Sequence, residues 1–261
     1  MDLIELAKRS SEISNRHPWE LARAEVMLKF IKQKLNTKEI LSVLDLGCGD
    51  TFLVEFLAKK LPSVKFYAVD IAFTDELIVK LQKNINPQIK IYKSQDEMLN
   101  DQLNLKVDLI LLLDVIEHIG DDIGFMKDLK LRTFTTEDTS ILISVPAYQS
   151  LFCSHDVFLG HYRRYTNSTL KRNLNQSGYS VTELQYFFTT LILPRVLQVI
   201  LEKLKGAKSE TTGLVEWNGS RRVTIIFKTI LVIDYSVSSF LNRIGINLPG
   251  LSNMALCKIS D

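Results

Sequence analysis

Acidic residues and glycines at the ends of predicted strands are the first candidates for chemistry. In the stretch SVLDLGCGD, an apolar strand pattern leads to Asp45 and then to a Gly-x-Gly turn at Gly47 and Gly49. Glycine lets the backbone approach a ligand closely, and the helix that follows offers unpaired N–H groups. Two later apolar runs also end in an acid, at Asp70 and Asp114. An acid at Asp70 can accept hydrogen bonds from ribose hydroxyls or cap a helix. Together with the glycines, it favours a nucleoside-containing cofactor.

The charge around the glycine turn favours one class of cofactor over another. A dinucleotide site needs a third glycine and a helix start that faces a pyrophosphate. Here Asp50 follows the turn and Asp45 precedes it, and negative charges in these places repel phosphate. They suit a ligand with an ammonium or sulfonium group. The sequence therefore favours S-adenosylmethionine over NAD as the cofactor.

A second set of candidates lies in residues 145–166, a long loop that follows a predicted strand and is rich in His, Arg and Tyr. Loops at the carboxyl end of a sheet commonly hold substrate-binding residues. The candidates for a general base are His155, His161 and, in an earlier loop, His118, because the pKa of histidine lies near neutral pH. The candidates for acceptor binding are Tyr148, Arg163, Arg164 and Tyr165, and the arginines suit a phosphate or a carboxylate. The same polar residues could instead cap a turn and form surface ion pairs.

Alternating strand and helix patterns supply the scaffold for these residues. Strands are predicted at 40–46, 65–70, 89–93, 107–113 and 140–145, and helices at 51–60, 75–83, 123–131 and 167–176. Such alternation implies a parallel sheet with right-handed crossovers. After Gly178 the pattern changes to a strand at 180–188, apolar helices at 189–205 and 223–244, and a last strand at 253–259.

We divide the chain into four parts on these patterns: an N-terminal helical segment (1–36), a cofactor-binding core (37–188), a helical insertion (189–250) and a last core strand (251–261). The N-terminal helix, which begins near Pro18, is expected to cover the core rather than to contact substrate. The insertion is apolar with basic flanks. It is interpreted as a cap over the acceptor site, a homodimer face, a membrane-facing helix pair or ordinary core helices.

Composition limits the remaining choices. The chain has 261 residues, of which 46% are hydrophobic, and a net charge of +2, so nothing favours a nucleic-acid partner. Its three cysteines are scattered and form no zinc pattern, so no metal site is predicted. The first residues do not resemble a signal peptide, and no stretch reaches the ~18 uncharged apolar residues of a spanning helix. We expect a cytoplasmic protein, with peripheral membrane contact through residues 189–244 as an open alternative.

Three motifs in order resemble those of class I S-adenosylmethionine-dependent methyltransferases: VLDLGCGD, YAVDI and DLILLLDVIEHI. The resemblance covers residues 40–185. It implies a Rossmann-like α/β fold, with a seven-stranded, mostly parallel sheet, helices on both faces and an antiparallel last strand. It also implies site roles. Asp45, Gly47, Cys48 and Gly49 would line the methionine moiety, Asp70 would hold the ribose hydroxyls, Ile71 and Asp96 would contact the adenine, and Asp114 would lie beside the amino acid end. One departure is Thr51, where many relatives carry glycine.

The pattern SHDVFLGHYRRYT also resembles a subgroup of these methyltransferases linked to sugar and glycan biosynthesis. The sequence thus predicts in-line methyl transfer to a small molecule or a sugar or glycan, including a lipid-linked or phosphorylated one. The pairs of basic residues favour an anionic acceptor. Two alternatives stay open: a non-catalytic protein that binds S-adenosylmethionine, and an NAD-linked oxidoreductase on the same fold.

Overall fold

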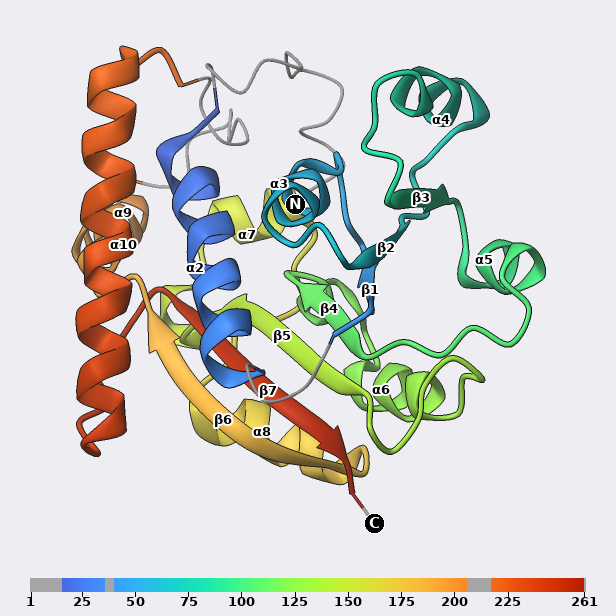
Figure 1. Ribbon diagram of the computed structural model, residues 1–261. Coiled ribbons are helices and arrows are strands. Elements are labelled where there is room, and N and C mark those ends of the chain that lie inside the picture. Colours follow the sequence, from blue (N-terminus) through green and yellow to red (C-terminus); the bar gives the residue numbers. More distant parts are fainter. Residues whose placement is uncertain (1–15, 36–39, 206–216, 261) are drawn as a thin grey trace.

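The computed structural model describes residues 16–35, 40–205 and 217–260 (Figure 1). A sheet crosses the middle of the molecule, and helices pack against both of its faces. Residues 1–15 of the predicted N-terminal segment and most of the polar loop after residue 205 lie outside the described residues.

The sheet has seven strands in the order β3-β2-β1-β4-β5-β7-β6. The strands are β1 (Ser42–Leu46), β2 (Lys65–Val69), β3 (Ile89–Tyr92), β4 (Leu109–Leu113), β5 (Ser140–Pro146), β6 (Tyr179–Phe187) and β7 (Ser252–Ile259). The first five pair in parallel, whereas β7 is antiparallel to both β5 and β6. β1 and β4 are buried along their whole lengths, as expected for central strands covered on both faces. The predicted mostly parallel sheet with an antiparallel last strand is confirmed.

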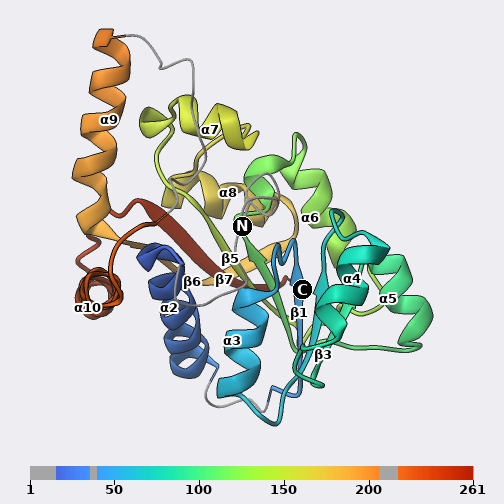
Figure 2. The ribbon, with the colours of Figure 1, turned by 90° about the horizontal axis from the view of Figure 1, so that it is seen from above.

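Two apolar cores hold the helices against this sheet. The helices are α2 (Pro18–Lys34), α3 (Phe52–Lys60), α4 (Asp75–Gln82), α5 (Gln95–Asp101), α6 (Asp122–Lys130), α7 (Ser154–Leu159), α8 (Asn167–Gln176), α9 (Ile192–Lys205) and α10 (Arg221–Arg243). Side chains of α2, α3 and α10 join the core on one face, and side chains of α5, α6 and α8 join the core on the other. Figure 2 shows α2, α3 and α10 on one side of the sheet and α6 and α8 on the opposite side.

Two helices were not predicted from the sequence, and both have local causes: α5 lies where no element was predicted, and α7 lies within the loop predicted at 145–166. In α5, the Ser94 hydroxyl accepts from the Glu97 N–H at 3.1 Å, and the Glu97 carboxylate accepts from the Lys93 N–H at 2.8 Å. Ser94 is thus the N-cap of α5, and the Glu97 carboxylate binds the N–H of the residue before the cap. The short α7 begins at Ser154, after which the buried Asp156 carboxylate accepts from the Cys153 N–H at 3.0 Å. Three single-turn 3₁₀ helices, η2 (Ile116–His118), η3 (Gln149–Leu151) and η4 (Thr189–Leu191), complete the loops at this end of the sheet.

The predicted pair of apolar helices lies between β6 and β7 as α9 and α10. α10 packs beside α2 at the edge of the molecule (Figure 1). Two charged side chains in its middle face the protein: Lys228 pairs with Glu25 of α2 at 3.2 Å, and Asp234 accepts from the N–H of Thr190 at 2.7 Å. By length and composition alone α10 could cross a membrane, although core helices of soluble proteins pass the same test.

Candidate active site

The loops after β1 and β2 are joined by one buried carboxylate. The N–H of Gly49 donates to Asp70 Oδ2 at 2.8 Å, and the N–H of Ala72 donates to Asp70 Oδ1 at 3.0 Å. Gly47 has a φ of +74°, and a Cβ at this position would lie 2.8 Å from Val115 Cγ2. Because both facts exclude a side chain, the chain needs glycine here to bring its backbone against the β4 loop.

Thr51, the departure noted in the sequence, has a φ of +65°. Glycine adopts this left-handed conformation without strain, whereas a β-branched residue does not. The Thr51 hydroxyl donates to Glu55 Oε1 at 2.9 Å. The loop therefore keeps its shape with threonine, supported by α3.

A small hollow of about 30 Å³ lies between the glycine loop and α2. Asp45 of β1 and Gly47 and Cys48 of the loop after it line one side, and Trp19, Glu20 and Arg23 of α2 line the other. Burial raises the pKa of the Asp45 carboxyl to about 7. The acidic lining suits the ammonium and sulfonium end of S-adenosylmethionine, and it does not suit a pyrophosphate.

The remaining predicted cofactor residues, Asp114, Ile71 and Asp96, differ in their contacts and exposure. Asp114, at the end of β4, has a φ of +59° and pairs with Arg23 of α2 at 2.9 Å. Ile71 follows Asp70 and is 88% exposed, so its face is open to a planar ligand. Asp96 is exposed, and its carboxylate pairs with Arg132 beyond the end of α6 at 3.2 Å. The adenine role of Asp96 therefore stays a prediction.

The part played by α2 was not foreseen. We expected this helix to cover the core, and its buried face does so. Its first turns, however, also close over the site. Arg16, just before the helix, pairs with Asp50 and lies over the Phe52 ring at 4.0 Å. Arg23 pairs with Asp114 and donates to Ser144 Oγ at 3.1 Å. The sequence held one signal for this role: arginines at the start of the N-terminal helix could pair with the acids of the strand-end loops.

A larger cavity of about 530 Å³ adjoins the small hollow, since Trp19 and Glu20 line both. Its other walls come from the β4 and β5 loops, α7, α9 and α10. They include Asp114, Glu117, Pro146, His155, Leu159, His161, Arg164, Leu191, Pro194, Arg195, Trp217, Phe227, Ile230, Leu231 and Leu251. This volume lies in the range of small-molecule sites, about 300–1,000 Å³, and its lining is mostly apolar with a few polar groups.

Three side chains on the β4 side of this cavity form what we call the His–Glu cluster: Glu117, His118 and His161. One potential ligand atom from each lies within 4.8 Å of the other two. The His118 and His161 rings meet edge to face at 4.6 Å. His161 Nδ1 donates to Asp156 Oδ1 at 2.9 Å, and Asp156 is fully buried. A carboxylate that holds a histidine in this way fixes its tautomer and its orientation.

The three histidine candidates are brought to one region, but their environments differ. Burial lowers the pKa of both His155 and His118 to about 4, and for His118 the neighbouring His161 adds to this effect. A histidine with such a pKa is a weak general base at neutral pH. His161 has a carboxylate partner, so the geometry favours it. Glu117 was not singled out in the sequence, although its place beside His118 in the motif DVIEHI was a usable signal.

Some of the predicted acceptor-binding residues line the cavity, and others hold the surrounding loops in place. Arg164 lines the cavity, and its Nε donates to Asp156 Oδ1 at 2.8 Å. Tyr148 stacks on Tyr186 with ring centroids 4.9 Å apart. Arg163 and Tyr165 make their contacts away from the cavity lining, in the network described next. An additional cavity residue, Arg195 of α9, was missed because the sequence could not show which face of that helix turns inward.

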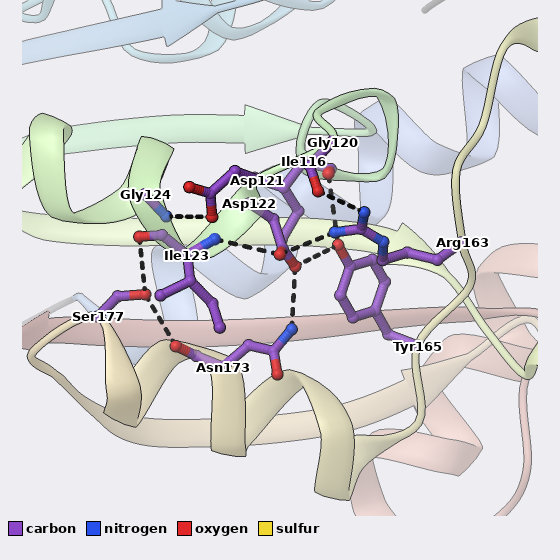
Figure 3. A network of polar contacts seen from close by, with 10 residues as sticks. All are labelled: Ile116, Gly120, Asp121, Asp122, Ile123, Gly124, Arg163, Tyr165, Asn173 and Ser177. Carbon is purple, nitrogen blue, oxygen red and sulfur yellow. Dashed lines mark hydrogen bonds and ion pairs between the residues drawn. The ribbon is translucent and has the colours of Figure 1, made fainter.

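Asp122, at the start of α6, is the centre of that network (Figure 3). Its Oδ2 accepts from Tyr165 Oη at 2.7 Å and from Asn173 Nδ2 at 3.0 Å. Its Oδ1 pairs with Arg163 at 2.8 Å. These bonds tie the loop before α8 to α6, so we assign Arg163 and Tyr165 a structural role.

Replacement of Asp122 by alanine should destabilise the protein by about 2–4 kcal/mol, because three partners lose a buried acceptor and Arg163 is only partly exposed. Urea unfolding followed by circular dichroism measures the change. The matched control is Asp121→Ala, which removes only the cap that Asp121 gives to the N–H of Gly124 and should cost about 1 kcal/mol. Equal losses in the two variants would contradict the assigned role.

Comparison with known structures supports the fold. A search of curated protein sequences finds no match. Among solved structures, the chain is similar to an S-adenosylmethionine-dependent methyltransferase from Archaeoglobus fulgidus (20% identity, 90% of this chain and 94% of that chain covered, TM-score 0.50). It is also similar to the plantazolicin methyltransferase BamL in complex with a triazolic desmethylPZN analog and SAH (15% identity, 94% and 86% covered, TM-score 0.53). A third similar structure is coclaurine N-methyltransferase bound to N-methylheliamine and SAH (16% identity, 90% and 70% covered, TM-score 0.52). At these identities the structures support the fold alone.

The family itself is shown by sequence. Residues 16–184, more than half of the chain, match the model of a family described as a methyltransferase domain. The match includes α2, the glycine loop, Asp70, Asp114 and the histidine loop. The chain belongs to this methyltransferase-domain family, and it is an S-adenosylmethionine-dependent methyltransferase.

Proposed function

We propose that the protein methylates an oxygen of an amphipathic, anionic acceptor, of the class of lipid-linked or phosphorylated saccharides. The observation that carries this proposal is the cavity of about 530 Å³ that adjoins the cofactor hollow and is walled by apolar side chains of α9 and α10. Such walls favour an apolar portion of the acceptor. The net charge of +2 gives no reason to expect a nucleic-acid acceptor.

Arg195 supplies the positive charge for an anionic group. It lines the cavity from α9, and its Nη1 contacts Cys153 Sγ at 2.7 Å. Within the described parts of the chain, Arg195 makes no ion pair, whereas Arg164 is already paired with Asp156. A guanidinium without a carboxylate partner is well suited to a phosphate or carboxylate of the acceptor.

The outer faces of the same two helices support delivery from a lipid surface. Large apolar side chains on them are exposed, namely Leu193, Leu197, Ile200, Leu201 and Leu204 on α9 and Ile225, Ile226, Ile233, Val237 and Phe240 on α10. We call this set the apolar face. The charged groups in the middle of α10 turn toward the protein, and Arg221 and Arg222 at its start are exposed. An apolar face with basic residues at a helix end favours anionic membranes.

In this scheme each part of the site has one task. The sulfonium of the cofactor supplies an activated methyl group. Asp70 holds the ribose of the cofactor and Asp45 its methionine end, and the cavity places the acceptor oxygen at the His–Glu cluster beside Asp114. Positioning of two reactants in line removes several kcal/mol from a methyl-transfer barrier.

The proposed acceptor is tested with labelled S-adenosylmethionine and a lipid extract from the source cells. We expect label in lipid-soluble, anionic products, and a loss of at least tenfold in Arg195→Gln through the lost charge-assisted contact. Label found only in neutral, water-soluble products would contradict the proposal.

Membrane contact is tested by flotation with vesicles. The double variant Ile226→Glu, Phe240→Glu should lose binding to vesicles that contain phosphatidylglycerol, because it places two charges on the apolar face. The control is Leu103→Glu, which charges an exposed leucine in the loop after α5, away from α9 and α10. Wild-type protein that stays with the soluble fraction, and migrates as a dimer, would assign the face to a second copy instead.

The affinity for S-adenosylmethionine should rise about tenfold between pH 6 and pH 8 and then level off, because Asp45 ionises near pH 7 and the ionised carboxyl attracts the cationic end of the cofactor. Calorimetric titration across this range measures the change. The α-amino group of the ligand also titrates above neutral pH, so the control is Asp45→Asn, in which the rise should disappear. A rise of the same size in both proteins would contradict the role of Asp45.

A further inference from the structure

We propose that the His–Glu cluster binds one divalent transition-metal ion at the wall of the acceptor cavity. Its three potential ligand atoms lie within 4.8 Å of one another. Two imidazoles and one carboxylate form a ligand set that Zn²⁺ and related ions accept, with further positions left open for water or substrate.

Glu117 is the member that points most strongly to a cation. Its side chain is fully buried, and neither carboxylate oxygen has a hydrogen-bond partner among the described residues. Buried carboxylates in proteins are normally hydrogen-bonded, paired with a cation or bound to a metal. Arg23, whose charge acts on Glu117, is itself paired with Asp114 at 2.9 Å.

His161 is oriented as metal-ligating histidines are. Its Nδ1–H donates to the buried Asp156, which leaves Nε2 with a free lone pair. Asp156 is itself held by Arg164 Nε at 2.8 Å and by the N–H of Cys153 at 3.0 Å. A carboxylate behind a histidine fixes the ring and raises its basicity as a ligand.

The place of the cluster gives the ion a task, and this step rests on the proposed function. Glu117 and His161 line the acceptor cavity, so an open position of the ion would take the acceptor hydroxyl. The bound hydroxyl releases its proton to solvent, and its oxygen forms a bond to the methyl carbon. The bond from carbon to sulfur breaks, and the sulfur keeps the electron pair as the neutral thioether of S-adenosylhomocysteine.

The sequence analysis predicted no metal site because no compact ligand spacing is present. The structure explains the difference: Glu117 and His118 lie in η2 after β4, and His161 lies after α7, so the topology of the sheet brings distant positions together.

Metal binding is measured on the full chain, independently of activity, by equilibrium dialysis against Zn²⁺ and by the visible spectrum with Co²⁺. We expect one ion per chain and a Co²⁺ spectrum with nitrogen and oxygen ligands. Glu117→Gln and His118→Gln should each weaken metal binding at least tenfold, and the control His155→Gln, in the same cavity but outside the cluster, should bind as the wild type does. Circular dichroism and calorimetric titration with S-adenosylmethionine establish that each variant is folded.

The outcomes separate the metal site from the proposed function. No bound metal in the wild type, or equal metal binding in folded Glu117→Gln, would overturn the metal site. Methyl transfer that persists at full rate after chelation would overturn its role. Metal bound at one per chain, without transfer to any lipid-soluble acceptor, would support the site and contradict only the proposed acceptor.

Discussion

Replacement of Asp70 by alanine should weaken S-adenosylmethionine binding by at least 100-fold. Its buried carboxylate accepts from the N–H groups of Gly49 and Ala72, and a carboxylate has further lone pairs for the two ribose hydroxyls. A hydrogen bond to a charged group contributes about 1.5–3 kcal/mol, so the loss of two exceeds a factor of 100. Calorimetric titration of the purified protein measures the change.

Two further proteins make this prediction specific. Asp75→Ala removes an exposed acid at the start of α4 and should bind the cofactor as the wild type does. Asp70→Asn keeps the size of the side chain and loses its charge, so we expect an intermediate affinity. Retention of wild-type affinity in a folded Asp70→Ala protein would mean that the ribose is held elsewhere.

Replacement of His161 by asparagine should lower the rate of methyl transfer by about 10²–10⁴-fold while cofactor binding is kept. His161 is the cavity histidine with a carboxylate partner, Asp156, at 2.9 Å. This loss is expected whether His161 acts on the acceptor proton directly or through a bound metal, because both need its ring in place. Single-turnover transfer of labelled methyl, with cofactor titration alongside, separates chemistry from binding.

The matched comparison is His155→Asn. It removes a histidine from the wall of the same cavity, but burial lowers the pKa of His155 to about 4, so little proton transfer is lost. We expect a loss below tenfold. A larger loss of rate in His155→Asn than in His161→Asn would contradict the role given to His161 and would favour His155, the first general-base candidate from the sequence.

Much of the fold could be predicted because its signals are local. Apolar runs such as Val107–Leu113 have strand length, and the structure places β4 within this run at Leu109–Leu113. Pro18 starts α2 as expected for the first turn of a helix. The Ser94 cap of α5 is an equally local signal, although no helix was predicted there.

The candidate site could be predicted only where its residues follow single strands. Asp45 lies one residue before the end of β1, and Asp70 and Asp114 directly follow β2 and β4, so the carboxyl edge of the sheet brings them together. The roles of Arg23 and Arg195 depend on which face of a helix turns inward, and that is decided by tertiary packing. Arg163 and Tyr165 were predicted to bind the acceptor because arginine and tyrosine suit that role. In the structure, both side chains bind Asp122 instead.

Parallel titrations with S-adenosylmethionine and NAD test the central claim most directly. The acidic loop around Asp45 and Asp50, and the crevice beneath α2, predict micromolar binding of S-adenosylmethionine and no measurable binding of NAD. Binding of NAD instead would contradict the reading of the glycine loop, and with it the roles given to Asp70, Asp114 and the adjoining cavity.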